Sequence, residues 1–435
     1  MAIAIFLLTL TLVIWQPRGL GIGFSALGGA LLALVTGVVT LQDIPTVWAI
    51  VWNATFTLIA LVIICLILDE AGFFRWLALQ VARGGMGRGG VLFPLVVVLG
   101  ALVTALLTND GTALIWTPTV MEMLLLLGFS SRAILAFAFA TGFIANATSL
   151  PLPVSNLVNI IAADYFHISF LRYVMVMVPV NFVAIASSLG VLWFYFDRDI
   201  PPTYNLECLP PPKSVIRDPL VCQWSFAILG LLLIGYFLAE RVSLPVSSVA
   251  GFSALVMVAL AGRWFHRHDT PIIKIRKVLW EAPWQVILFS LGMYLVVIGL
   301  QNAGMTTLLS QQLEALSGWG LTLAATGTGF LATLLSGVMN NLPTVLINAL
   351  AIQDATGIEP AVREVMVYAN VIGCNIGAKI TPIGSLSTLL WLDVLRRKGL
   401  RISWGEYVRI ALILTIPVLF VSLLSLAIWL PWLIA

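Results

Sequence analysis

The chain has 435 residues, of which 60% are hydrophobic and only 9% are charged, with a net charge of +3. There are too few polar side chains to cover a water-soluble globule of this size, and the composition therefore excludes a soluble enzyme. It predicts an all-α polytopic membrane protein without a nucleic-acid partner. The four scattered cysteines predict neither a disulfide framework nor a thiolate metal site.

The first apolar segments predict three membrane-spanning helices near residues 2–16, 21–40 and 46–68, because about 20 apolar residues cross a bilayer core of about 30 Å. Residues 73–81 predict a helix at the membrane surface, where aromatic and basic side chains gather. The connector at 83–90 formally matches G-x-G-x-x-G, but no strand precedes it, so it does not indicate a nucleotide site.

An apolar run from Val91 to Leu127 is interrupted by the polar residues 108–112, TNDGT. Two apolar arms around a polar tip predict a re-entrant hairpin whose non-helical tip is buried in protein. One ordinary span followed by a loop is the alternative. An Asp at this depth costs about 2.5 to 3.5 kcal/mol, so Asp110 is the first functional candidate.

The next segment, Arg132 to Asp164, has 33 residues and would be about 50 Å long as one helix, much longer than a bilayer core. We therefore expect the helix to unwind around Asn146 to Pro153. Residues 170–195 predict a plain span. Residues 197–219, with five prolines between Pro201 and Pro212, predict a cytoplasmic linker between an N-terminal repeat (1–196) and a C-terminal repeat (220–435).

The second half repeats this plan. It predicts spans near 222–239, 246–262 and 284–301, a surface helix at 305–316, a hairpin at 321–354, a broken helix at 362–395 and a closing span from 407. The second hairpin has the polar tip MNNLPT (339–344), and the second break is CNIGAKITP (374–382). When Asn146 is set over Asn375, Pro153 falls on Pro382, which indicates two copies of one plan.

Each half crosses the membrane five times, because a hairpin returns to its own side, so the fold has ten crossings plus two hairpins. An odd number of crossings predicts that the two repeats are inverted relative to each other. Lys379 and Arg409 lie inside apolar segments and are set aside. Alternating the crossings places seventeen of the other basic residues, Arg267 among them, on one side and only Arg172, Arg241 and Arg363 on the other. The basic side is predicted to be cytoplasmic, which puts both termini in the periplasm of a bacterial inner-membrane protein.

Two ionisable residues, Asp110 and Lys379, fall in the breaks. One hypothesis is a buried ion pair that joins the two halves. The other is that Asp110 takes up and releases a proton, with Lys379 adjusting its proton affinity. Glu122 is interpreted as a helix-surface residue turned toward protein, with a proton carrier as the alternative. The histidines are expected at membrane edges and in loops, so no metal site and no cofactor are predicted; they are His167, His266 and His268.

Several motifs carry a resemblance that covers essentially the whole chain. They are WQPRGLGIG (15–23), NDGTALI (109–115), SLGMYLVV (290–297), MNNLPTV (339–345), VYANVIGCN (367–375) and TPIGS (381–385). With these motifs the chain resembles the bacterial arsenite efflux permeases of arsenical-resistance operons. Those permeases belong to the ion transporter superfamily, whose two re-entrant hairpins and two broken helices match the predicted architecture.

The resemblance implies export of trivalent arsenite and antimonite in exchange for protons, optionally driven by a docked cytoplasmic ATPase subunit. The chain departs from the family at Asn146 and Asn375, where the family often has Asp, and at Ala378, where it often has Pro. The loss of two carboxylates shifts more of the proton-carrying role to Asp110. Arsenous acid is a small neutral triol near pH 7, which amide and hydroxyl groups can bind without a counter-ion.

The predicted substrate-binding residues lie at the two tips and the two breaks: Thr108, Asn109, Asn146, Thr148, Ser149, Asn340, Asn341, Thr344, Cys374, Asn375, Thr381 and Ser385. Asp110 and Lys379 are predicted to couple transport to protons. The alternatives are a sodium- or proton-coupled anion transporter of the same superfamily, or a passive pore subunit of an ATP-driven arsenite pump. The chain has no G-K-[ST] loop for ATP hydrolysis. An intramembrane enzyme is a third possibility, but there is no H-E-x-x-H motif and no plausible nucleophile–base pair, so the chain is not predicted to be an enzyme.

Overall fold

The computed structural model describes residues 1–264 and 270–434, so His266, Arg267 and His268 lie outside the described residues. Within these ranges the regular structure is helical, which confirms the all-α prediction. Seven helical segments there are long and apolar enough to cross a membrane, and four shorter apolar helices accompany them.

The first half consists of the following elements: α1 (Ala2–Trp15), η1 (Pro17–Gly19), α2 (Ile22–Val35), α3 (Asp43–Glu70), α4 (Phe73–Gly84), α5 (Gly89–Leu106), α6 (Asn109–Gly111), the π-helical η2 (Thr112–Trp116), α7 (Thr117–Leu126), α8 (Ser131–Ala147), η3 (Pro153–Ser155), α9 (Leu157–Tyr165) and α10 (Phe170–Phe196). The predicted order of elements is confirmed. Helix α2 ends earlier than predicted, because the chain turns at Gly37 with a φ of +71°.

The linker contains η4 (Asp197–Asp199) and η5 (Pro212–Val215). The second half consists of α11 (Pro219–Arg241), α12 (Val246–Ala261), α13 (Ile275–Glu281), α14 (Gln285–Asn302), α15 (Met305–Ser317), α16 (Leu321–Met339), α17 (Asn341–Asp354), α18 (Pro360–Ile376), η6 (Gly377–Ile380), α19 (Leu386–Arg397) and α20 (Trp404–Ile434). The short helix α13 was not predicted, since its sequence IRKVLWE is too charged to read as a span.

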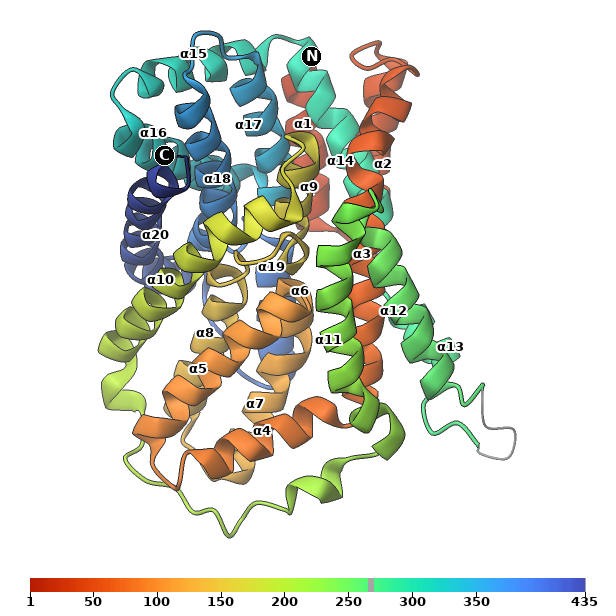
Figure 1. Cartoon of the computed structure of the whole chain (residues 1–435), viewed down its shortest axis with the longest axis vertical. Coiled ribbons are helices and arrows are strands. Elements are labelled where there is room, and N and C mark those ends of the chain that lie inside the picture. Colours follow the sequence, from red (N-terminus) through yellow and green to blue (C-terminus); the bar gives the residue numbers. More distant parts are fainter. Residues whose placement is uncertain (265–269, 435) are drawn as a thin grey trace.

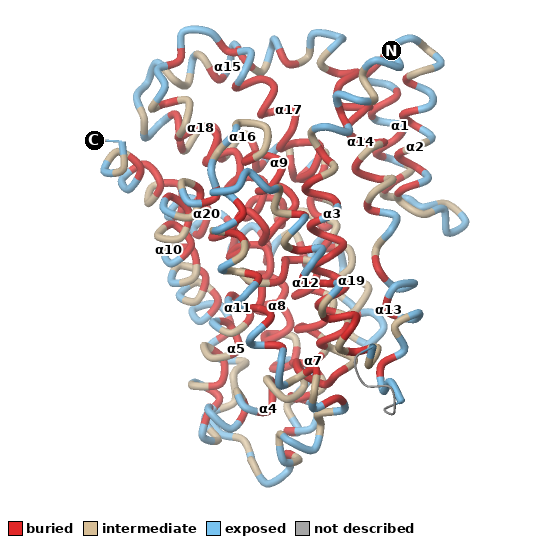
Figure 2. The backbone as a smooth tube through the Cα atoms, turned by 45° about the vertical axis from the view of Figure 1, so that its right-hand side comes forward, coloured by how far each residue is buried: buried red, intermediate tan, exposed pale blue. Residues whose placement is uncertain are grey.

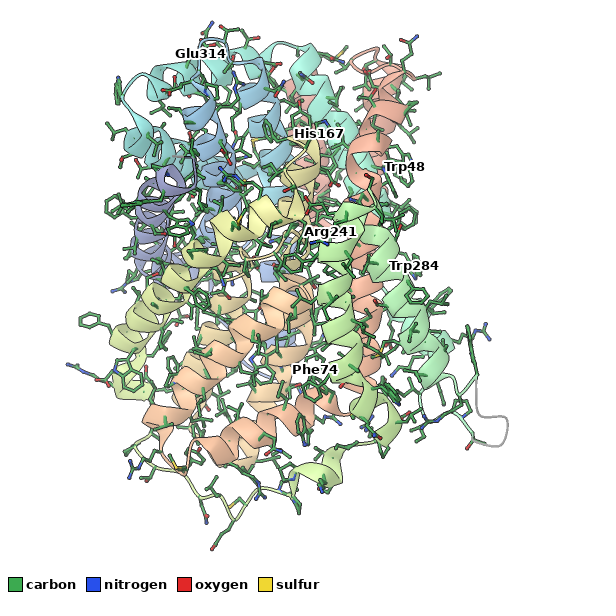
Figure 3. The ribbon with its side chains drawn as sticks, in the orientation of Figure 1. Trp48, Phe74, His167, Arg241, Trp284 and Glu314 are labelled. Atoms are coloured by element: carbon green, nitrogen blue, oxygen red, sulfur yellow. The ribbon has the colours of Figure 1, made fainter. Side chains whose placement is uncertain are left out.

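The two surface helices mark opposite ends of the molecule. Figure 1 shows α4 and the linker at the bottom and α15 at the top. In Figure 3, Phe74 on α4 and Glu314 on α15 label these ends. Helices α5 and α7 extend inward from the α4 end. Helices α16 and α17 and both termini lie in the upper part of the view, near α15.

Burial is concentrated where the broken segments meet. Figure 2 shows buried backbone along α8, α9, α17 and α18 in the interior, while the linker, the turns and the outer faces of α10 and α11 are more exposed. This is the pattern of a helical bundle whose apolar outer faces meet lipid and whose interior is filled by protein.

Glycines allow α16 and α18 to approach closely. A Cβ on Gly373 would collide with the Gly329 carbonyl oxygen, and one on Gly377 would collide with the Thr333 side chain. Only small residues permit this helix spacing. The second hairpin is therefore packed firmly against the helix that precedes the second break.

Candidate functional site

The two hairpin tips share one backbone design. Thr108 has a φ of 155° and Asn340 has a φ of 75°, both in a region that non-glycine residues rarely adopt. Thr108 Oγ1 accepts a hydrogen bond from the Gly111 N–H at 3.1 Å, and Asn340 Oδ1 accepts one from the Leu342 N–H at 3.3 Å. Each tip residue therefore caps the helical arm that follows it.

Four residues further on, each tip has a threonine with the same role. Thr112 Oγ1 donates to the Thr108 carbonyl at 3.0 Å, and Thr344 Oγ1 donates to the Asn340 carbonyl at 2.7 Å. Thr108 thus corresponds to Asn340 and Thr112 to Thr344. In this register, Asp110 corresponds to Leu342.

The two broken helices also correspond. Helices α8 and α18 each have 17 residues, and Asn146 and Asn375 are each the second-last residue. After each helix the chain leaves α-helical geometry and then resumes it in α9 and α19. This confirms that the long segment Arg132 to Asp164 unwinds after Asn146.

A first polar cluster joins the first tip to both breaks. Asn109 Nδ2 donates to Asn146 Oδ1 at 3.2 Å and to Ser387 Oγ at 3.1 Å. Ser387 Oγ lies 2.9 Å from Asn146 Oδ1 and 2.7 Å from Ser385 Oγ. All four side chains are at least 97% buried. Residues far apart in the sequence thus form one junction of amide and hydroxyl groups.

A second cluster surrounds Asn375 with residues of the first half. Asn375 Oδ1 accepts from Ser149 Oγ at 3.0 Å and from Asn156 Nδ2. Asn375 Nδ2 donates to Asn159 Oδ1 at 2.7 Å and to the Val371 carbonyl at 2.8 Å. The Asn375 amide is therefore fully hydrogen-bonded.

Ser149 connects the two clusters, because its hydroxyl also lies 2.9 Å from the Asn146 carbonyl oxygen. The second tip reaches the same region through its backbone, where the Asn341 N–H donates to the Gly384 carbonyl at 2.8 Å. Asn340 Nδ2 donates to the Ile383 carbonyl at 3.1 Å. The second tip thus contacts the second break directly beside Ser385 of the first cluster.

Two side-chain atoms of the first cluster have no hydrogen-bond partner in the described part of the chain. They are Asn109 Oδ1, an acceptor, and Asn146 Nδ2, a donor. Buried amide atoms are rarely left unpaired, because each such atom costs about 1–3 kcal/mol. An acceptor and a donor on neighbouring amides suit a small hydroxylated solute.

Other predicted site residues lie close to the junction but use their side chains elsewhere. The hydroxyls of Thr148 and Thr381 donate to the Ile144 and Gly337 carbonyls at 2.8 and 2.6 Å. The Cys374 thiol faces Asn370 Oδ1 at 3.4 Å, on the side of α17. The side chains of Thr148 and Thr381 therefore stabilise the backbone around the breaks, and that of Cys374 contacts α18, instead of lining the junction.

Sequence reasoning missed three members of the clusters, Asn156, Asn159 and Ser387. All three lie at or just inside the start of the half-helices α9 and α19. Asn156 caps α9, accepting from the Val158 N–H at 3.2 Å, so an Asn directly before an apolar run was the available signal.

The ion-pair hypothesis for Asp110 and Lys379 is wrong, because the structure forms no such pair between these two described residues. Lys379 is 94% buried, and its Nζ lies 5.9 Å from the centre of the Phe143 ring. The reason is local: η6 packs against α16 and α20, which directs the ammonium toward α8 instead of α6. Asp110 is half-buried beside Ser387.

Glu122 matches its interpretation as a surface residue, since its side chain is 40% exposed. It contacts Lys398 at 2.7 Å and Arg75 at 3.7 Å. Such exposed pairs contribute about 0–1 kcal/mol, so Glu122 is a weak fastening between α4, α7 and the end of α19.

Apolar spanning helices, two paired hairpin tips and two helix breaks around a buried polar junction define a multi-pass membrane transporter. The family model described as arsenical pump membrane protein matches residues 1–430, and the chain belongs to that family. Its resemblance to arsenite efflux permeases is thereby confirmed.

The relatives agree with the family match. The chain is 55% identical over 424 residues to arsenical pump membrane proteins of Escherichia coli and Yersinia enterocolitica, covering 98% of this chain and 97% of each relative. Its fold resembles the crystal structure of the Alcanivorax borkumensis YdaH transporter, described as having an unusual topology. That match has a TM-score of 0.54 and 15% identity, and covers 88% of this chain and 87% of the other.

Proposed function

We propose that the chain exports arsenite and antimonite across the bacterial inner membrane in exchange for protons, by alternating access to one central site. The names of the relatives at 55% identity support the substrate class. The observation that carries the site assignment is the uncharged junction of Asn109 and Asn146, with one unpaired acceptor and one unpaired donor among the described residues.

The scaffold we propose is a pair of inverted repeats, residues 1–196 and 220–435, joined by the linker 197–219. The matching tips, the matching 17-residue helices and the opposite positions of α4 and α15 support this arrangement. It has ten crossings and two re-entrant hairpins, and both termini face the periplasm. An inverted pair suits alternating access, because each repeat can expose the shared site to one side.

Arsenous acid fits the junction because it is neutral and carries only hydroxyl groups. One hydroxyl can donate to Asn109 Oδ1 while another accepts from Asn146 Nδ2. Neither contact needs a charge on the protein. The remaining polar atoms nearby, including Ser385 and Ser387, are within the same hydrogen-bonded cluster and can exchange partners as the site opens.

We assign the proton to Asp110, which directly follows Asn109 and has no cationic partner within the described residues. A carboxyl group there can be neutral or charged, so its protonation alters the polarity of the tip when the metalloid leaves. Lys379, which forms no ion pair in the described ranges either, is a candidate for adjusting this step. One proton moving through 100 mV supplies about 2.3 kcal/mol, enough for a gradient of roughly fiftyfold without a docked ATPase.

The proposal is tested with everted membrane vesicles, which should accumulate arsenite when their interior is made acidic. Asp110→Asn should abolish gradient-driven accumulation, and Glu122→Gln, which removes another carboxylate of the same hairpin, should retain it. Full accumulation by Asp110→Asn would remove Asp110 as the carrier. Accumulation that requires sodium would instead indicate a sodium-coupled transporter.

A further inference from the structure

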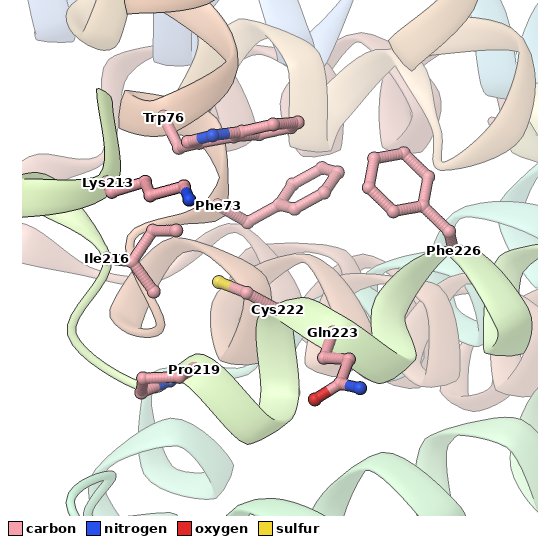
Figure 4. Close-up of a pocket in the computed structure, with 8 residues that line it drawn as sticks. All are labelled: Phe73, Trp76, Lys213, Ile216, Pro219, Cys222, Gln223 and Phe226. Atoms are coloured by element: carbon pink, nitrogen blue, oxygen red, sulfur yellow. The ribbon is translucent and has the colours of Figure 1, made fainter. Parts of the chain in front are cut away.

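A cavity of about 390 Å³ lies between α4, the end of the linker and the start of α11, remote from the central junction. Figure 4 shows its wall, which is mostly apolar and aromatic. The lining residues are Phe73, Trp76, Lys213, Ile216, Pro219, Cys222, Gln223 and Phe226.

Three aromatic rings form the apolar part of the cavity. The centres of the Phe73 and Phe226 rings are 5.4 Å apart, and those of Trp76 and Phe226 are 6.0 Å apart. Phe226 is 57% exposed on the spanning helix α11, so the cavity opens toward the lipid-facing side of that helix. Aromatic side chains in such a position are typical of the membrane interface.

Lys213 supplies the single positive charge of the cavity. In Figure 4 its side chain extends between Trp76 and Ile216 toward Phe73. The nearby acidic groups already have partners: Asp218 binds Arg263 at 2.9 Å, and Glu70 binds Lys277 at 2.7 Å. No ion pair of Lys213 occurs within residues 1–264 and 270–434.

Backbone hydrogen bonds attach the linker to both ends of α4, and the linker thereby holds Lys213 in place. The Arg217 and Asp218 N–H groups both donate to the Ala71 carbonyl, at 2.9 and 3.2 Å. The Tyr204 N–H donates to the Gly87 carbonyl at 2.9 Å, and the Gly89 N–H donates to the Pro202 carbonyl at 3.2 Å. The cavity is therefore bounded by backbone that is fastened at both ends of α4.

We propose that this cavity binds one anionic phospholipid, with its phosphate on Lys213 and part of an acyl chain against Phe73, Trp76 and Phe226. A lysine without an ion-pair partner in the described ranges, beside an aromatic, lipid-facing wall, matches a molecule with an anionic head and an apolar tail. The lipid bridges α4 and α11, and α4 contacts α7 of the first hairpin through Arg75 and Glu122. The site is independent of the transported substrate.

The test is native mass spectrometry of the full-length protein, released from nanodiscs that contain equal amounts of phosphatidylglycerol and phosphatidylcholine. The protein should retain one phosphatidylglycerol preferentially. Lys213→Gln should weaken that retention about fivefold, since one lysine near a membrane surface contributes about a factor of that size. Lys274→Gln, which removes another exposed lysine of the same end of the molecule, should not.

A second variant tests the cavity itself. Cys222→Phe places a larger side chain in the cavity and should displace the retained lipid while leaving Lys213 intact. Equal retention of the two lipids by the native chain, or unchanged retention by both Lys213→Gln and Cys222→Phe, would overturn the proposal.

Discussion

The two broken helices have the same length and place an asparagine at the same position, yet the two asparagines differ in their surroundings. Asn375 uses its whole amide: the oxygen accepts two hydrogen bonds and the nitrogen donates two. Asn146 leaves its amide nitrogen without a partner among the described residues. The difference indicates that Asn375 fastens the second half of the chain to the first, whereas Asn146 keeps a donor for the proposed substrate.

The hairpins differ in the same sense. The first hairpin has an ionisable residue, Asp110, at the position where the second has Leu342. The second arm of the first hairpin contains the π-helical η2, whereas the corresponding helix α17 is regular. π-Helical turns occur often at functional sites. The second hairpin is instead locked to α18 through glycine contacts. We infer that the first hairpin carries the chemistry and that the second hairpin positions it.

The largest expected difference between the two asparagines is in the thermal stability of the variants in which each is replaced by leucine. Asn375→Leu removes four hydrogen bonds, worth about 0.5–1.5 kcal/mol each, and leaves the buried Asn159 Oδ1 without its partner, so a large loss of thermal stability is expected. Asn146→Leu removes two hydrogen bonds, and both partners keep another one, so it should cost less stability. Size-exclusion chromatography after heating measures both, and equal stability of the two variants would contradict the assignment of Asn375 as the fastening.

Glycine substitutions compare the packing of the hairpins. An alanine at Gly373 collides with the Gly329 backbone oxygen, and we expect a loss of about 1–3 kcal/mol from overpacking. An alanine at Gly100 of α5 meets the Ile144 side chain at 3.0 Å and the Trp116 ring at 3.1 Å, and shifts of a few tenths of an ångström relieve both contacts. Thermal unfolding should therefore be shifted clearly in Gly373→Ala and little in Gly100→Ala; the reverse order would refute the tighter packing of the second hairpin.

Truncation of the first-cluster asparagine should affect substrate binding. Asn146→Ala removes the proposed hydrogen bond to the metalloid, worth about 0.5–1.5 kcal/mol, together with the two that Asn146 Oδ1 accepts from Asn109 and Ser387. KM for arsenite should therefore rise at least roughly two- to tenfold. Asn348→Ala, at a buried asparagine on α17 outside the junction, is the control and should leave KM unchanged. Initial-rate uptake into everted vesicles provides the measurement, and an unaltered KM in Asn146→Ala would place the substrate elsewhere.

The smallest effect is expected at Glu122. Its two ion pairs are exposed, so Glu122→Gln should lower stability by at most about 1 kcal/mol. Raising the salt concentration should reduce even this difference, because salt screens exposed charges. A large, salt-independent destabilisation would show that α4 depends on this contact more than its exposure indicates.

The sequence was sufficient to predict the tips and breaks, because polar residues inside long apolar runs are costly in a bilayer unless protein surrounds them. It was insufficient to predict the partners of those residues. That Asn375 binds Ser149, Asn156 and Asn159 depends on how α18 packs against α8 and α9. These contacts join residues more than 200 positions apart, which no local sequence pattern reveals. Lys379 faces Phe143 because of the direction in which η6 leaves α18, which charge alone did not reveal.

The most direct test of a substrate site at the junction is anomalous diffraction at the arsenic absorption edge, from crystals of the protein grown with arsenite. We expect one dominant peak next to the side-chain amides of Asn109 and Asn146, and loss of that peak in Asn146→Leu. A dominant peak beside Cys374 or within the Asn375 cluster, or a peak that persists in the variant, would contradict this assignment.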